Sequence, residues 1–347
     1  MWILSSANGN TPPDLFISDQ IKNTVFITGG AGYVGAALVP HLLEKGYVVT
    51  VLDLMIYGEE VLPPHRNLNV VKGDIRDKAL IKALIPGHEA VIHLACISND
   101  PSFELNPELG KSINLDAFRP LVIISKNNGV QRFIYASSSS VYGIKDEPNV
   151  HEKMTIEPLT NYSRFKADCE KILAEYQSED FTTVTIRPAT VCGYSPRQRL
   201  DVVVNILTNL AYHNRKISVF GGDQLRPNIH IKDMVDAYMV LLTVSKEKIA
   251  GKIFNAGYEN QTVKELAETV KSVVGEDVNL ITTPTDDNRS YHISSQKIKD
   301  ELGFETTHTI REAAEDLCKA FDKGLLPDSL EADIYFNIKR MQSLNLA

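Results

Sequence analysis

Tyr162 and Lys166 are two side chains whose types and spacing could do chemistry. They lie four residues apart in YSRFK, and residues four apart share one face of a helix. A nearby ammonium group favours a phenolate, so Lys166 would lower the pKa of Tyr162 from about 10 towards the working range. The phenol could then exchange a proton with a substrate hydroxyl. The serines of SSSSVYG (137–143) follow the apolar segment RFIYA, and one of their hydroxyls could hold the same oxygen.

A glycine-rich segment, TGGAGYVG (28–35), has the spacing of a phosphate-binding loop. Gly29, Gly32 and Gly35 fit G-x-x-G-x-x-G, and residues without a Cβ let the backbone approach a pyrophosphate at the start of the next helix. The strand after that helix ends in Asp53, where an acid can accept hydrogen bonds from an adenosine ribose. An aspartate would repel a 2′-phosphate, and no arginine adjoins it in the sequence. The pattern therefore predicts NAD rather than NADP, with hydride transfer at a hydroxyl-bearing carbon.

Apolar strands alternating with stretches of helical length must position these residues. Continuous apolar strands joined by helices predict a Rossmann-type doubly wound α/β fold, with a parallel sheet covered on both faces. The predicted strands are 25–28, 48–53, 69–74, 90–95, 132–137 and 182–188.

The pattern changes after Pro188, where strands become short and irregular between helices. The later strands are predicted at 217–222 and 252–257, and the later helices at 261–274 and 309–323. The sequence therefore predicts three parts. They are a loose leader (1–21), an NAD-binding domain carrying the catalytic residues (22–188), and a smaller mixed α/β substrate-binding lobe with some returns to the sheet (189–347).

Composition excludes several classes of partner. The net charge is −8 over 347 residues and no basic run occurs, so we expect no nucleic acid partner. No apolar run approaches the roughly 20 residues that span a bilayer, and the N-terminus makes a poor signal peptide. The four cysteines are scattered without metal-ligand or disulfide spacing, so we expect no metal site and a cytoplasmic protein. Cys96 and Cys192 are expected to be small buried residues, with a position near the catalytic serines as the alternative for either.

The ordered motifs TGGAGYVG, Asp53, GDIRD (73–77), HLAC (93–96), SSSSVYG and YSRFK closely resemble the extended short-chain dehydrogenase/reductase superfamily. More narrowly, they resemble its NAD-dependent epimerase/dehydratase group, which UDP-glucose 4-epimerase typifies. The resemblance covers about residues 22–325. It implies bound NAD and a nucleotide-diphosphate sugar as substrate.

The same motifs imply roles for individual residues. Ser138 would be the catalytic hydroxyl that also touches the substrate, and Tyr162 would be the acid/base. Lys166 would also hold the nicotinamide ribose, so both it and Tyr162 would contact the cofactor. The other implied cofactor contacts are Gly29, Gly32, Tyr33, Val34, Gly35, Asp53, Asp74, Ile75, Leu94, Ala95 and Asn114.

Arginines in the second half match substrate-binding positions of the family. Arg226 in LRPNIHIKD fits R-x-x-I-H-x-x-D, and Arg289 in DDNRSY fits a later arginine. Both would reach the diphosphate, because guanidinium binds phosphate bidentately. Each could instead be a surface ion-pair residue. SPRQRLD offers Arg197 and Arg199 either as further substrate contacts or as loop structure.

The reaction is narrowed by what stands at particular positions. Thr190 replaces the Asn that is usual in the family's epimerases, so we expect a different substrate pocket. Ser139 and Ser140 replace the Asp-Glu pair of 4,6-dehydratases, and Ser140 also replaces the Glu of decarboxylases and the Cys of 3,5-epimerase/reductases. The remaining reaction is oxidation and reduction at one sugar carbon, most often C4, as an epimerase carries it out. A 4-dehydrogenase or ketosugar reductase would use the same residues.

Two other classes stay open with less support. A catalytically silent NAD(H)-binding regulator would be expected to lose Tyr162 or Lys166, and both are present. A reductase of steroid-like or flavonoid-like ketones would have an apolar pocket without the arginine pair.

The family commonly forms homodimers through a four-helix bundle, built from the helix around 111–127 and the Tyr-Lys helix. We expect a homodimer of this kind. Its apolar positions could pack in that bundle or equally face the sheet; they are Ile113, Phe118, Val122, Cys169 and Leu173.

Overall fold

The computed structural model describes residues 23–285, 290 and 292–346. The predicted leader and Arg289 lie outside these residues. The six predicted strands are present, as β1 (Thr24–Thr28), β2 (Val48–Asp53), β3 (Leu68–Lys72), β4 (Ala90–His93), β5 (Arg132–Ala136) and β6 (Thr182–Pro188). With β10 (Lys252–Ala256) they form one parallel sheet in the order β10-β6-β5-β4-β1-β2-β3. The predicted Rossmann-type sheet is therefore confirmed, and its order reverses between β1 and β4, where such sheets bind ligands.

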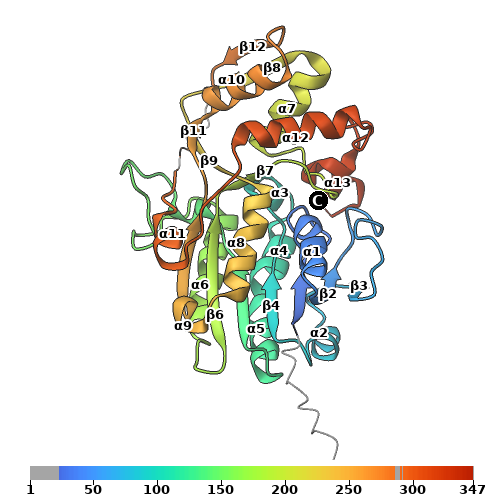
Figure 1. Cartoon of the computed structure of the whole chain (residues 1–347), viewed down its shortest axis with the longest axis vertical. Helices are drawn as coiled ribbons and strands as arrows, with labels where there is room; N and C mark the ends of the chain where they lie inside the picture. The colour runs from blue at the N-terminus through green and yellow to red at the C-terminus, as the bar shows by residue number, and fades with distance from the viewer. Residues whose placement is uncertain (1–22, 286–289, 291, 347) are drawn as a thin grey trace, which may run out of the picture.

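Helices cover both faces of this sheet (Figure 1). The alternation of side chains along a strand decides which face each residue enters. Ile27 packs in one cluster with α1 and α8, whereas the adjacent Phe26 packs in the other with α2, α5 and α6. These helices are α1 (Gly35–Glu44), α8 (Ile231–Thr243), α2 (Lys78–Leu84), α5 (Phe118–Asn127) and α6 (Asn161–Ala174).

The second half adds a smaller lobe above the carboxyl ends of the strands (Figure 1). It contains a three-stranded sheet, β11-β9-β7, and a two-stranded sheet, β12-β8. Thr262 with Glu265 and Thr309 with Glu312 form capping boxes that begin α10 and α12. The bounds are β7 (Thr190–Cys192), β8 (Lys216–Phe220), β9 (Leu225–His230), β11 (Asn260–Thr262), β12 (Asn279–Thr283), α7 (Val203–Asn214), α10 (Val263–Val274) and α12 (Ile310–Asp322).

Short elements complete the described chain. Between β4 and α5 lie α3 (Asp100–Leu105), α4 (Pro107–Lys111) and the π-helix η1 (Ser112–Asp116). A 3-10 turn, η2 (Ser139–Tyr142), follows β5. The remaining elements are α9 (Lys246–Ile249), α11 (Gln296–Leu302), the 3-10 turn η3 (Asp333–Tyr335) and α13 (Asn337–Ser343). Within the described ranges, no helix combines the length and apolarity needed to cross a membrane.

The apolar residues considered for a subunit interface are used inside the chain. All of them are at most 4% exposed, because α5, α6 and η1 turn these side chains towards their own sheet. They are therefore not free to form an intersubunit bundle. The residues concerned are Ile113, Phe118, Val122, Cys169 and Leu173.

Candidate active site

The turn after β1 can receive a phosphate. Gly29 has φ +75, and a Cβ there would lie 2.5 Å from the backbone N of Ala95, so a side chain would collide with the β4 loop. A Cβ on Gly35 would lie 2.4 Å from the carbonyl O of Gly30. Helix α1 begins at Gly35 without a side-chain cap, so no side chain covers its positive N-terminal end, where an anion can bind. These features fit the pyrophosphate of a dinucleotide.

Asp53 ends β2 beside this turn. Its Oδ2 accepts a hydrogen bond from the Ala31 amide at 3.0 Å, and its Oδ1 accepts one from the Met55 amide at 2.8 Å. Burial raises the pKa of Asp53, while the two backbone hydrogen bonds oppose that rise. The carboxylate is thus held in one orientation, beside the position that a ribose would occupy.

One cavity of about 320 Å³ runs from the glycine turn to the predicted catalytic residues. It lies at the carboxyl ends of the central strands and under the second lobe. The structure brings together here cofactor, catalytic and substrate candidates that the chain separates widely. The predicted residues that line the cavity are Gly29, Gly32, Tyr33, Val34, Gly35, Asp53, Ile75, Leu94, Ala95, Ser138, Tyr162, Lys166, Thr190 and Arg199.

Tyr162 and Lys166 lie on the first turns of α6. Thr160 accepts a hydrogen bond from the Ser163 amide and fixes where the helix begins. Tyr162 therefore sits at the positive end of a 14-residue helix, which favours a phenolate. The Lys166 Nζ donates to the Ala136 carbonyl at 2.6 Å and lies 5.9 Å from the centre of the Tyr162 ring. The loop after β5 brings Ser138 to the same cavity.

The pKa of Tyr162 differs from the expectation. Burial raises it well above its usual range, and nearby Cys96 and Asp100 raise it further. Arg199 and a hydrogen bond with Ser138 lower it. Desolvation thus outweighs the charges around the phenol, and the predicted lowering by Lys166 is not among the largest influences. A phenol with a raised pKa is suited to donating its proton.

Three predicted contacts lie away from the cavity lining. Asp74 pairs with the exposed guanidinium of Arg76 at 2.5 Å, because the arginine two residues later captures its carboxylate. Asn114 is buried and accepts from the Ile97 amide at 2.8 Å while donating to the Ile97 carbonyl at 2.9 Å. It therefore positions the loop after β4 from within η1. Arg226 lies on β9, outside the cavity lining, and donates to the Leu225 carbonyl.

Other residues reach the cavity without having been predicted there. Cys96 is half-buried and lines it, so the expectation of a buried cysteine is wrong there, whereas Cys192 is fully buried as expected. Cys96 follows a parallel strand, and the rule that ligands bind at strand ends could have indicated it. Tyr57 and Asn337 also line the cavity, from the β2–β3 connection and the C-terminal helix. No sequence signal pointed to either of them.

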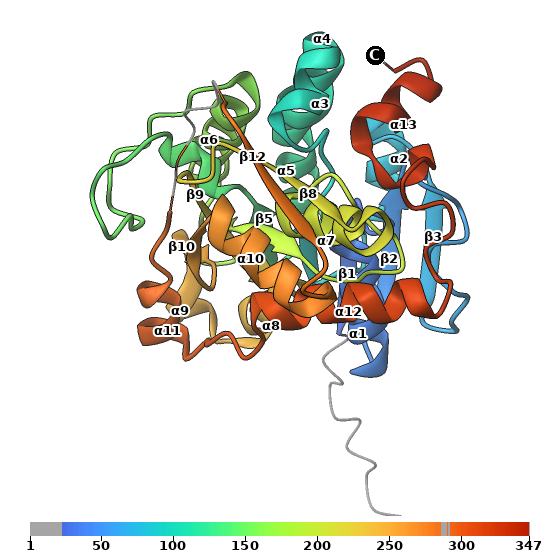
Figure 2. The same cartoon turned by 90° about the horizontal axis from the view of Figure 1, so that it is seen from above.

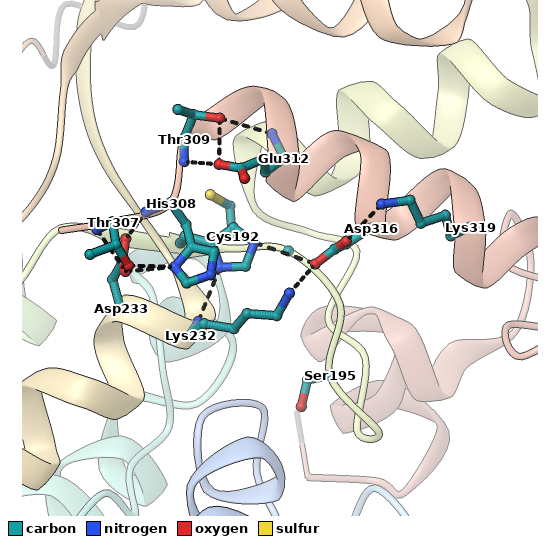
Figure 3. Close-up of polar contacts among 12 residues, drawn as sticks. Cys192, Ser195, Lys232, Asp233, Thr307, His308, Thr309, Glu312, Asp316 and Lys319 are labelled. Carbon is teal, nitrogen blue, oxygen red and sulfur yellow. Dashed lines mark hydrogen bonds and ion pairs between the residues drawn. The ribbon is translucent and has the colours of Figure 1, made fainter.

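The motif that contains Arg226 serves the fold through its histidine and aspartate. His230 caps α8 by accepting from the Lys232 amide, and its ring stacks on His308 with centres 4.8 Å apart. Asp233 accepts hydrogen bonds from Thr307 and from the His308 amide and ring (Figure 3). These contacts join α8 to the start of α12.

The contacts between α8 and the start of α12 should make the stability of the protein depend on pH through His230. Burial, His308 and Lys232 lower the pKa of His230 from 6.5 to about 4, against the opposing effect of Asp316 and Asp233. His230 is thus neutral in the folded protein. Its contribution to the free energy of unfolding is complete above pH 6.5 and is lost as pH falls towards 4, because the unfolded chain binds a proton there before the folded protein does. The loss for this group is about 3 kcal/mol. We expect the free energy of unfolding, measured by urea titration, to fall accordingly.

His230→Asn is the matched variant, because asparagine keeps a capping acceptor but does not titrate. Its stability should fall less steeply over the same pH range. His93, whose pKa burial lowers to about 3, titrates in both proteins and cancels in the comparison. Parallel curves for the two proteins would contradict the assignment to His230.

Comparisons with known proteins agree with this architecture. The chain is 30% identical to dTDP-D-glucose 4,6-dehydratase of Bos taurus, over 86% of this chain and 87% of that protein. It is similar to the structure of UDP-glucose 4-epimerase of Thermotoga maritima with UDP-glucose, with a TM-score of 0.78, 26% identity, and 87% and 99% of the two chains covered. It is also similar to MoeE5 in complex with UDP-glucuronic acid and NAD, with a TM-score of 0.76, 26% identity, and 87% and 99% covered. The sequence model of the NAD dependent epimerase/dehydratase family matches residues 25–257, and the chain belongs to this NAD-dependent family of enzymes.

Proposed function

We propose that the protein is an NAD-dependent nucleotide-sugar epimerase that inverts a hydroxyl-bearing carbon, C4 of the sugar. The observation that carries the proposal is the single cavity in which Ser138, Tyr162 and Lys166 meet the glycine turn. The named relatives and structural neighbours act on or bind nucleotide sugars, which supports that substrate class. Arg199 also lines the cavity and would serve the anionic substrate.

The chain's own residues divide the work in this proposal. Bound NAD supplies the acceptor and donor of the hydride. Tyr162 removes the proton from the sugar hydroxyl and returns it to the keto oxygen, and Ser138 holds that oxygen by a hydrogen bond. Arg199 places positive charge near the phenol and Ser138 donates a hydrogen bond to it, and both lower the pKa of Tyr162 and favour proton removal. The raised pKa of Tyr162 favours the return step.

We propose epimerisation and not dehydration because Ser139 and Ser140 carry hydroxyl groups where a dehydratase needs an acid and a base. Elimination of water needs an acid and a base beside the catalytic hydroxyl, and that stretch carries Ser139 and Ser140. The Ser140 Oγ lies 2.8 Å from the Ser138 Oγ and is engaged with it. Serine does not replace a carboxylate in acid–base chemistry near neutral pH. Cys96 and Asp100 also line the cavity and lie near the Tyr162 phenol, but they come from the segment after β4 and not from the stretch beside Ser138.

A labelled substrate distinguishes the reactions. UDP-, GDP-, CDP- and dTDP-sugars carrying deuterium at C4 are incubated with the purified protein, and the products are read by NMR and mass spectrometry. We expect an inverted C4 that keeps its deuterium, with no net formation of NADH. Deuterium at C6 with loss of water would indicate a dehydratase. Turnover that needs added NAD⁺ and yields NADH would indicate a 4-dehydrogenase, and reduction of a keto-sugar with added NADH a reductase.

The same proposal includes a homodimer and a cytoplasmic location. A homodimer through α5 and α6 would have to use their outer faces, where Ile123 is 37% exposed, because the inner faces are covered by the sheet. The four free cysteines fit a cytoplasmic protein. A silent regulator is disfavoured because Tyr162 and Lys166 reach the cofactor cavity.

A further inference from the structure

Arg197 is a buried cation that forms no ion pair with any residue that the structure describes. Its side chain lines the cavity, yet the residue is only 4% exposed. The guanidinium carbon lies 3.4 Å from the centre of the Tyr57 ring, and one Nη donates to the Asn337 Oδ1 at 2.8 Å. In the described part of the chain its Nε has no hydrogen-bond partner. A buried guanidinium in this condition is costly unless an anion binds it.

The loop that carries Arg197 is attached to the phosphate-binding turn. The Ser195 Oγ donates to the Tyr33 carbonyl at 2.7 Å, and the Tyr33 hydroxyl donates to the Gly193 carbonyl at 2.6 Å. Tyr33 belongs to the glycine turn that precedes α1. These two bonds hold the Arg197 loop against the glycine turn, the expected binding site of a pyrophosphate.

The other side of Arg197 is held by the C-terminal helix. The Asn337 Oδ1 accepts from the Tyr57 hydroxyl at 2.9 Å as well as from Arg197, and the Asn337 Nδ2 donates to the Ser98 Oγ at 2.9 Å. The Asn337 amide donates to Asp201 at 2.8 Å. Helix α13 thus lies against the β2 side of the central sheet (Figure 2), and Asn337 is 2% exposed there.

We propose that Arg197 binds the pyrophosphate of NAD, opposite the N-terminus of α1, and that Tyr57 and Asn337 are positioning residues that aim it. Burial lowers the pKa of Arg197 to about 10, and the neighbouring Arg199 also lowers it, while Tyr57, Asp201 and Asp53 raise it. The group is therefore cationic at neutral pH. A bound pyrophosphate would supply the missing acceptor for the Nε. This inference rests on NAD dependence and not on the reaction proposed above.

Arg197→Met tests the assignment, since methionine keeps an apolar stem over Tyr57 but has no charge. Equilibrium dialysis of the purified protein against labelled NAD⁺ should show affinity weakened about 10- to 100-fold, the value of a charge-assisted hydrogen bond. The thermal midpoint without added nucleotide should stay the same or rise, because an unpaired buried charge is gone. Arg119→Met, in an exposed ion pair on α5, is the matched control and should leave NAD⁺ affinity unchanged.

Asn337→Asp provides a second variant that keeps Arg197. The new carboxylate would pair with the guanidinium and compete with the pyrophosphate, so NAD⁺ affinity should fall without loss of thermal stability. Dialysis against NADP⁺ and UDP separates the possible phosphates. Loss of UDP binding alone would assign Arg197 to the substrate, and loss of NADP⁺ binding alone to a 2′-phosphate; either would overturn the proposal. Unchanged NAD⁺ affinity in both variants would leave Arg197 a purely structural residue and would also overturn it.

Discussion

Tyr162→Phe is expected to lower turnover of the sugar substrate by at least about a hundredfold, while NAD remains bound. The change removes one oxygen from a side chain that lines the cavity, and Thr160 with Ser163 still begins the helix around it. The lost step is proton exchange with the sugar hydroxyl. Initial rates on the substrate identified above, together with the nucleotide content of the purified variant, measure the two effects separately.

Tyr176→Phe is the matched control, because Tyr176 follows the same helix but contacts Arg119 on the outer surface. Its turnover should equal that of the wild type. Lys166→Met should act differently from Tyr162→Phe, because Lys166 is expected to hold the cofactor ribose as well and its loss should also reduce bound NAD. Near-normal turnover in Tyr162→Phe would mean that another group takes the proton. Cys96 and Asp100, which lie near the phenol, would then be the residues to replace next.

The parts of the site that depend on local spacing could be predicted from the sequence. The glycine turn, Asp53 and the Tyr162–Lys166 pair each occupy one short segment, so a period of 3.6 or a strand followed by a turn is enough to place them. The sheet followed in the same way from continuous apolar strands. Asp74 shows the limit of this reasoning, because its motif predicts an adenine contact but does not indicate that the carboxylate also pairs with Arg76.

Contacts between residues from distant segments could not be predicted from the sequence. Tyr57, Arg197 and Asn337 come from three distant segments, and only their packing makes them one cluster. The apolar faces of α5 and α6 posed a related problem, since an apolar stripe marks a buried face without saying whether the chain's own sheet or a second subunit covers it. Here the sheet covers it.

Glu170→Gln is expected to destabilise the fold by about 3–5 kcal/mol, because it leaves the buried Arg187 without its anion. Arg187 donates from Nη2 and Nε to the two oxygens of Glu170, at 2.6 and 2.9 Å, and the side chains are 3% and 4% exposed. Burial alone would lower the pKa of Arg187, but Glu170 raises it above its usual value. The Ser137 hydroxyl also donates to Glu170, one turn along α6 from Lys166, so this pair supports the catalytic strand end.

Chemical denaturation monitored by circular dichroism measures the loss. Glu175→Gln makes the same change at the end of the same helix, where Glu175 pairs with Arg119 and the side chains are 52% and 42% exposed; its effect should be far smaller. Glu170→Gln combined with Arg187→Met should recover part of the loss, because the uncompensated charge is then absent. Equal destabilisation by Glu170→Gln and Glu175→Gln would show that the buried pair does not hold α6 to β6, and that the apolar contacts of Cys169 and Leu173 alone fix the helix that carries Tyr162 and Lys166.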